Sequence, residues 1–108
     1  MALLAPPDDM IVRFLPLYRE LVDRLGFISS AAPLQYTNWY RDPVHNQAVG
    51  GHPFSQHQWG FAVDVVSSNP DATVRAARQM GFVAVDEFDH VHIQIFPAGF
   101  LESVGLRT

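Results

Sequence analysis

Cysteine is absent from this chain of 108 residues. The chain therefore contains no disulfide bond, and no thiolate can serve as a nucleophile or as a metal ligand. Any metal site in this protein has to be built from histidine, aspartate and glutamate side chains.

Lysine is also absent, since all seven basic residues are arginine, and the net charge is -4. The arginines form no basic run, so the chain lacks the phosphate-neutralising surface that nucleic-acid-binding proteins need. No apolar stretch approaches the roughly 20 residues of a membrane span. We therefore expect neither a nucleic-acid partner nor a membrane span. Residues 1–7 are apolar but lack the basic start and the long apolar centre of a signal peptide, and the sequence gives no further indication of location.

The composition, with 48% hydrophobic and 17% charged residues, is typical of a folded globular chain. The length is close to that of a common single domain. No internal repeat and no interior linker divides the chain. We therefore expect residues 1–108 to form one domain.

The stretch from residue 10 to residue 25 predicts an amphipathic helix. Its apolar residues recur at steps of three and four, which places them on one face: Ile11, Phe14, Leu15, Tyr18, Leu21, Val22 and Leu25. Asp8 or Asp9 would cap its start, Pro16 would kink it and Gly26 would end it.

The remaining chain alternates short strands with short helices. Alternation and β-branched or aromatic content predict strands over residues 34–40, 60–66, 82–85 and 90–96. Helices are expected over 44–49, where Asp42 and Pro43 form a favourable start, and over about 72–80. Residues 52–58 are expected to be loop, and residues 98–108 show no strong pattern. The sequence thus predicts an α+β domain: a small antiparallel sheet with helices on one face, its last two strands forming a hairpin.

The strand over residues 90–95 carries polar side chains on one face only. His90, His92 and Gln94 alternate with apolar residues that would point into the core. In the strand that contains Asp64, the aspartate shares a face with Ala62. If the two strands are neighbours, Asp64 and a histidine of the other strand approach a common point.

His57 precedes Asp64 by seven residues, with Gly60 between them. A turn at the glycine would let both side chains converge, so that His57 joins Asp64 and a histidine of the far strand. Two imidazoles and one carboxylate leave a fourth zinc position open for water, which is the catalytic arrangement. The alternative is that these are scattered surface histidines.

The spacing does not choose between His90 and His92 as the ligand from the last strand. Alternate residues of one strand lie about 6.8 Å apart, and both histidines can reach one metal ion. A zinc hydrolase also needs a proton shuttle. Asp89 at the mouth of this strand is the main candidate, and Glu87 is expected in the solvated turn.

Two further residues are candidates for substrate binding. Arg41 follows a predicted strand, and its fixed charge suits a substrate carboxylate or a developing oxyanion; the alternative is a structural salt bridge, for example to Asp42. Ser55 would either hydrogen-bond the substrate or cap its own loop. His45 and His52 have no evident partner and are expected to be ordinary surface residues.

Three stretches together resemble a known family of zinc peptidases, those of the D-alanyl-D-alanine carboxypeptidase type. The most specific is serine-x-histidine-x-x-glycine-x-alanine-x-aspartate at residues 55–64, and the resemblance covers roughly residues 39–95. The stretches are Tyr40-Arg41-Asp42-Pro43 through Asn46, Ser55 to Asp64, and Asp89-His90-Val91-His92. The group includes D-Ala-D-Ala dipeptidases and phage L-alanyl-D-glutamate endolysins, and it shares its fold with the Hedgehog signalling domain.

The resemblance implies a Hedgehog/DD-peptidase-like fold and a role for each matching residue. One Zn²⁺ ion would be held by His57, Asp64 and His92. Asp89, three residues before the last ligand, would be the general base, and Arg41 would bind and polarise the substrate. His90 would face the substrate or support the ligands.

The function implied is zinc-dependent hydrolysis of peptide bonds in bacterial peptidoglycan stem peptides, of the D-Ala-D-Ala carboxypeptidase, dipeptidase or L-Ala-D-Glu endopeptidase type. The alternative is a catalytically inactive, metal-stabilised binding module, such as a phage particle component. The Hedgehog domain illustrates that this fold can keep its metal without hydrolysis. Asp89 favours the enzyme, because a purely structural site needs no base.

Overall fold

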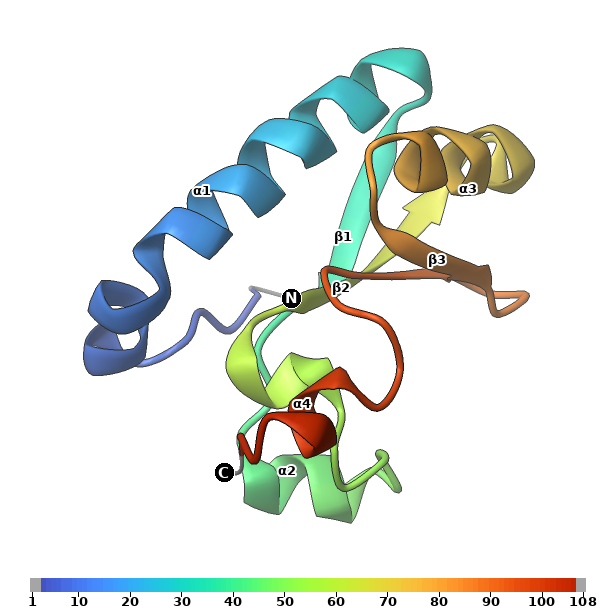
Figure 1. Cartoon of the computed structure of the whole chain (residues 1–108). Coiled ribbons are helices and arrows are strands. Elements are labelled where there is room, and N and C mark those ends of the chain that lie inside the picture. Colours follow the sequence, from blue (N-terminus) through green and yellow to red (C-terminus); the bar gives the residue numbers. More distant parts are fainter. Residues whose placement is uncertain (1–2, 107–108) are drawn as a thin grey trace.

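A four-stranded antiparallel sheet lies at the centre of the computed structural model, which describes residues 3–106 (Figure 1). The strands lie in the order β1-β2-β4-β3 and are β1 (Leu34–Asn38), β2 (Ala62–Ser67), β3 (Val83–Asp86) and β4 (Val91–Gln94). The helices are α1 (Asp8–Ala31), α2 (Pro43–Ala48), the 3₁₀ helix η1 (Gln56–Trp59), α3 (Pro70–Gln79) and α4 (Phe100–Ser103). The predicted α+β architecture is confirmed.

Helix α1 is longer than the sequence predicts, because it continues through Gly26 to Ala31. The prediction that Gly26 ends the helix is wrong. Ile28 is fully buried and extends the apolar stripe of Leu21 and Leu25 by one more turn. Burying such a side chain contributes roughly 2 kcal/mol, which exceeds the roughly 1 kcal/mol that a glycine costs inside a helix.

The start of α1 differs in detail from the expectation, whereas its kink agrees. Asp8 and Asp9 lie within the first turn, and the residue before the helix, Pro7, makes no side-chain cap. At Phe14 the backbone leaves helical geometry, with φ -114° and ψ 19°. This break lies two residues before Pro16, as expected for a proline that removes a backbone donor and crowds the preceding turn.

The main core lies between the sheet and the two longer helices. Alternate residues of β2 and β4 are buried together with apolar residues of α1, α3 and the start of β3. The buried residues of this core are Leu21, Leu25, Ile28, Val63, Val65, Ala77, Phe82, Ala84, Val91 and Ile93. Helices α1 and α3 therefore cover one face of the sheet, as predicted. The residues between these positions on β2 and β4 belong to the opposite face.

A second apolar cluster holds together α1, the segment before β2 and α4. It joins Tyr18 of α1, Trp59 of η1 and Phe61 to Leu101 of α4, which is only 3% exposed. The structure differs from the expectations at three places in this region. The predicted loop over 52–58 contains η1 in its second half, and β2 begins at Ala62 because Gly60 turns the chain with a φ of 71°. The tail after residue 98 forms α4.

The register of the sheet decides which polar side chains meet. Strands β2 and β4 are antiparallel neighbours, with Asp64 directly opposite His92. Strands β3 and β4 form the predicted hairpin. Asp42 caps α2 as predicted, since its carboxylate accepts the His45 backbone N–H at 2.7 Å.

Candidate metal and catalytic site

Three side chains from three elements converge on the open face of the sheet. His57 comes from η1, Asp64 from β2 and His92 from β4, and one ligand atom of each lies within 4.8 Å of the others. Asp64 Oδ1 is 3.2 Å from His57 Nε2 and 3.0 Å from His92 Nδ1. These distances allow the three atoms to share one cation.

The position of His57 follows from the local geometry of η1. The Ser55 hydroxyl accepts the His57 backbone N–H at 3.3 Å and so caps the 3₁₀ helix. Gly60 ends it in the left-handed region, where a Cβ would lie 2.7 Å from Pro6 Cγ. A glycine is therefore required to redirect the chain from His57 into β2.

A backbone carbonyl fixes the proton of His57. The Nδ1 atom lies 2.7 Å from the Trp39 carbonyl oxygen, which can only accept a hydrogen bond. The imidazole therefore carries its proton on Nδ1, and the lone pair of Nε2 points toward Asp64. Metal-binding histidines are commonly held in this way through their second nitrogen.

His92 and Asp64 are each oriented by a hydrogen bond to a side-chain amide. Gln94 Oε1 lies 2.8 Å from His92 Nε2, while the amide nitrogen of Gln94 donates to the Phe96 carbonyl. This orientation makes the glutamine oxygen the acceptor, so His92 keeps its proton on Nε2 and directs the Nδ1 lone pair inward. Asn38 Nδ2 donates to Asp64 Oδ2, the carboxylate oxygen that does not face the histidines, at 3.3 Å.

Two imidazole lone pairs and one carboxylate oxygen thus face one another without a donor between them. Such an arrangement requires protons or a cation to be stable. The donor set fits zinc, which binds imidazole nitrogen and carboxylate oxygen and keeps an open position when it has three protein ligands. His57, Asp64 and His92 are therefore a candidate metal site.

The electrostatics of the cluster favour charge separation in the absence of a metal. Burial opposes ionisation of Asp64, but hydrogen bonds and opposite charge from His57 and His92, which arise when these imidazoles carry a second proton, outweigh it and hold the pKa of the carboxyl well below its usual range. Burial also opposes protonation of His92, yet its hydrogen bonds to Asp64 and Gln94 leave its pKa raised. A cation entering the cluster takes the place of this proton.

His90 lies beside the cluster but farther from Asp64 than His92 does. Its Nε2 atom is 3.8 Å from Asp64 Oδ1, and its Nδ1 atom is bonded to Asp89 Oδ1 at 2.6 Å. The distances place His92 in the cluster and His90 at its edge, which the spacing alone left open.

The two acidic candidates of the hairpin turn occupy different positions. Asp89 is exposed over 88% of its side chain and contacts His90 rather than the cluster itself. Glu87 also belongs to the exposed turn, as expected. Its Oε1 atom nevertheless lies 3.9 Å from His90 Nε2 and 4.0 Å from His92 Nδ1, closer to the cluster than the sequence suggests.

Arg41 is held by a neutral group. Its Nη1 atom donates to Asn46 Oδ1 at 2.9 Å, and its backbone N–H donates to the His57 carbonyl. Among residues 3–106 it forms no ion pair, so the expected alternative of a salt bridge to Asp42 does not occur. The guanidinium charge is not neutralised by a carboxylate of the described chain.

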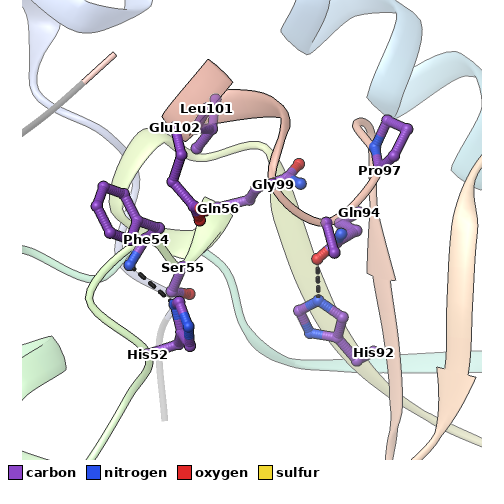
Figure 2. Close-up of a pocket in the computed structure, with 11 residues that line it drawn as sticks. His52, Phe54, Ser55, Gln56, His92, Gln94, Pro97, Gly99, Leu101 and Glu102 are labelled. Carbon is purple, nitrogen blue, oxygen red and sulfur yellow. Dashed lines mark hydrogen bonds between the residues drawn. The ribbon is translucent and has the colours of Figure 1, made fainter. Parts of the chain in front are cut away.

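A pocket of about 390 Å³ adjoins the cluster on the side of His92 (Figure 2). His92 and Gln94 of β4 form one side, and the chain after β4 together with α4 forms another. Ser55 lines the pocket as well as capping η1. His52, expected to be an ordinary surface residue, also lines it, whereas His45 is exposed on α2.

Sequence reasoning assigned no role to Gln94 or Asn38. The sequence does indicate that Gln94 lies near His92, because Gln94 follows it by two residues and therefore shares its face of β4. Asn38 has no local signal, because it reaches Asp64 only through the pairing of β1 with β2, which contains an irregularity between Tyr36 and Asn38.

Comparison with protein families gives one match: the model described as Peptidase M15 matches residues 11–94. This range contains the whole cluster. Searches of curated proteins and of solved structures gave no match. No helix among residues 3–106 is long and apolar enough to cross a membrane.

Proposed function

The chain belongs to the peptidase M15 family, a family of metallopeptidase hydrolases, and we propose that it is a zinc peptidase acting on the stem peptides of bacterial peptidoglycan. One observation carries the proposal: His57 Nε2, Asp64 Oδ1 and His92 Nδ1 converge with their lone pairs directed at one another. The similarity of residues 55–64 to D-alanyl-D-alanine carboxypeptidases supports the substrate class.

His57, Asp64 and His92 would hold the zinc ion, while Trp39 and Gln94 fix the imidazole protons. Zinc in such a site polarises a carbonyl and lowers the pKa of water toward about 7. The protein supplies the rest: a rigid ligand set, a neighbouring pocket and groups that accept and return a proton.

We assign proton transfer to Asp89, acting through the imidazole to which it is bonded. The carboxylate accepts the His90 Nδ1 proton, which leaves the Nε2 lone pair facing the cluster at 3.8 Å from Asp64. A proton taken up at Nε2 would be stabilised by Asp89 and could then be returned to the leaving amine. Glu87 is the competing base on distance, because its carboxylate lies near both His90 and His92.

Arg41 is proposed to bind an anionic group of the substrate or the developing oxyanion. Its guanidinium is oriented by the neutral Asn46 amide and is not paired with a carboxylate among residues 3–106. Such a charge retains its attraction for a negatively charged ligand group.

Paired isosteric variants test the base. Asp89→Asn should keep one zinc per chain and lose turnover of a stem peptide by about 100-fold or more, since general base catalysis contributes on the order of 10²–10⁴. Glu87→Gln, the matched variant in the same turn, should lose far less. The reverse ranking would make Glu87 the base. Wild-type protein that binds one zinc and cleaves none of a panel of stem peptides would instead be a metal-stabilised binding module.

A further inference from the structure

The pocket beside His92 has features of a substrate subsite. Its role as a subsite rests on the proposed function. It lies next to the candidate metal site, since His92 belongs to both. A peptide whose scissile bond lies at the cluster would therefore place a neighbouring residue in this pocket. The chemistry of the lining then indicates which residue that is.

Among residues 3–106, Glu102 is the only aspartate, glutamate or arginine that lines the pocket. Figure 2 shows its side chain extending from α4 toward the middle of the pocket, across from His92. None of the arginines among residues 3–106 lines the pocket, and Arg41 is hydrogen-bonded to Asn46 instead.

His52 also lines the pocket and is oriented by its own loop. Its Nδ1 atom accepts the Phe54 backbone N–H at 3.1 Å (Figure 2). The Glu102 carboxylate makes its side of the pocket negative. A substrate carboxylate would be repelled there, and an ammonium group would be attracted.

The remaining walls suit an aliphatic chain. Phe54, Pro97 and Leu101 line the pocket, and Leu101 is held in place by the second apolar cluster. An aliphatic stem that ends in an ammonium group matches both the apolar walls and the single carboxylate. A short acidic side chain matches neither.

We propose that this pocket binds the amine-bearing aliphatic side chain of a diamino acid residue in the peptide substrate, with the Glu102 carboxylate accepting hydrogen bonds from the ammonium. The pocket would thus select peptides that carry a diamino acid next to the scissile bond. It would also disfavour a free carboxylate in this position, as presented by a substrate of a carboxypeptidase.

Three synthetic stem peptides that differ at one residue test the subsite: lysine, Nε-acetyl-lysine and norleucine. For wild-type protein, kcat/KM should be about twofold to fivefold higher for the lysine peptide than for the other two, the range expected for one partly exposed ion pair. The ratio should fall toward one in Glu102→Gln and at high salt. The matched control Asp23→Asn, which removes an exposed carboxylate of α1 outside the pocket, should keep the wild-type ratio.

Binding of the same peptides, followed by NMR shifts of the Gly99 and Glu102 amides, separates this inference from the proposed function. Turnover of all three peptides at equal kcat/KM would overturn the subsite and leave the peptidase intact. Selective binding of the lysine peptide without any turnover would overturn the peptidase and leave the subsite intact. If the lysine peptide is neither bound nor cleaved selectively, the subsite is overturned, whether or not the protein is a peptidase.

Discussion

Gln94 acts on the candidate metal site through a single hydrogen bond. Its oxygen lies 2.8 Å from His92 Nε2, and its amide nitrogen is anchored on the Phe96 carbonyl. The bond selects the tautomer in which Nδ1 is free to bind a cation. Gln94 is therefore a positioning residue for the candidate ligand His92.

Replacing Gln94 should weaken zinc binding without removing a ligand. We expect Gln94→Ala to raise the zinc dissociation constant by about 10- to 100-fold, as is typical when the partner of a ligating histidine is lost. Competition with a chromophoric chelator measures this constant directly. Gln35→Ala, on an exposed position of β1, is the control and should bind zinc like wild type. An unchanged constant in Gln94→Ala would show that His92 does not depend on this bond.

At the scale of elements, α1 and η1 are joined by Tyr18, whose hydroxyl donates to the Trp59 carbonyl at 2.8 Å. Tyr18 also lies against the Gly60 turn that follows His57, with its ring 3.1 Å from where a Cβ would stand. The helix on one side of the molecule thus supports the element that carries a candidate ligand. Burial, with a smaller contribution from nearby Tyr40, raises the pKa of Tyr18 to about 12.

This shift makes stability depend on pH in alkaline solution. Between about pH 10 and 12, the unfolded chain loses the phenol proton while the folded protein keeps it, so the unfolded state binds fewer protons. The free energy of unfolding should therefore fall as pH rises, with a contribution from Tyr18 of up to about 1.4 kcal/mol per pH unit.

Tyr18→Phe isolates that contribution. At pH 7 the variant should be less stable by about 1 kcal/mol, because the Trp59 carbonyl loses its donor. Between pH 10 and 12 the wild type should lose stability more steeply than the variant, so the two curves should converge and then cross. Denaturant unfolding at a series of pH values provides the measurement. Curves that stay parallel over this range would contradict the assigned pKa.

The elements that the sequence predicted well are those with a strict local pattern. The alternation over 90–95 predicts which side chains of β4 share a face, and the structure places Asp64 opposite His92 on the neighbouring strand. The prediction that α1 ends at Gly26 is wrong because the free-energy cost of a glycine inside a helix is outweighed by the burial of Ile28 against distant parts of the chain. Helix α4 forms because Leu101 is buried in a cluster assembled from three parts of the chain, which no local pattern reveals.

At the scale of the whole molecule, the layered arrangement explains why a site can exist in so small a chain. Helices α1 and α3 cover one face of the sheet and bury its apolar residues. The opposite face of β2 and β4 carries Asp64 and His92, and η1 brings His57 to it. The core thus stays on one side, and the polar cluster and its pocket occupy the other.

If a metal ion held by His57, Asp64 and His92 is needed for peptide hydrolysis, a zinc titration should reveal the requirement. Metal-free protein is titrated with zinc while cleavage of a stem peptide is followed. We expect no cleavage without zinc, a rise in the cleavage rate that saturates at one equivalent per chain, and no such rise in His92→Ala. Cleavage that is independent of zinc, or zinc bound at one equivalent with no peptide cleaved, would contradict this expectation.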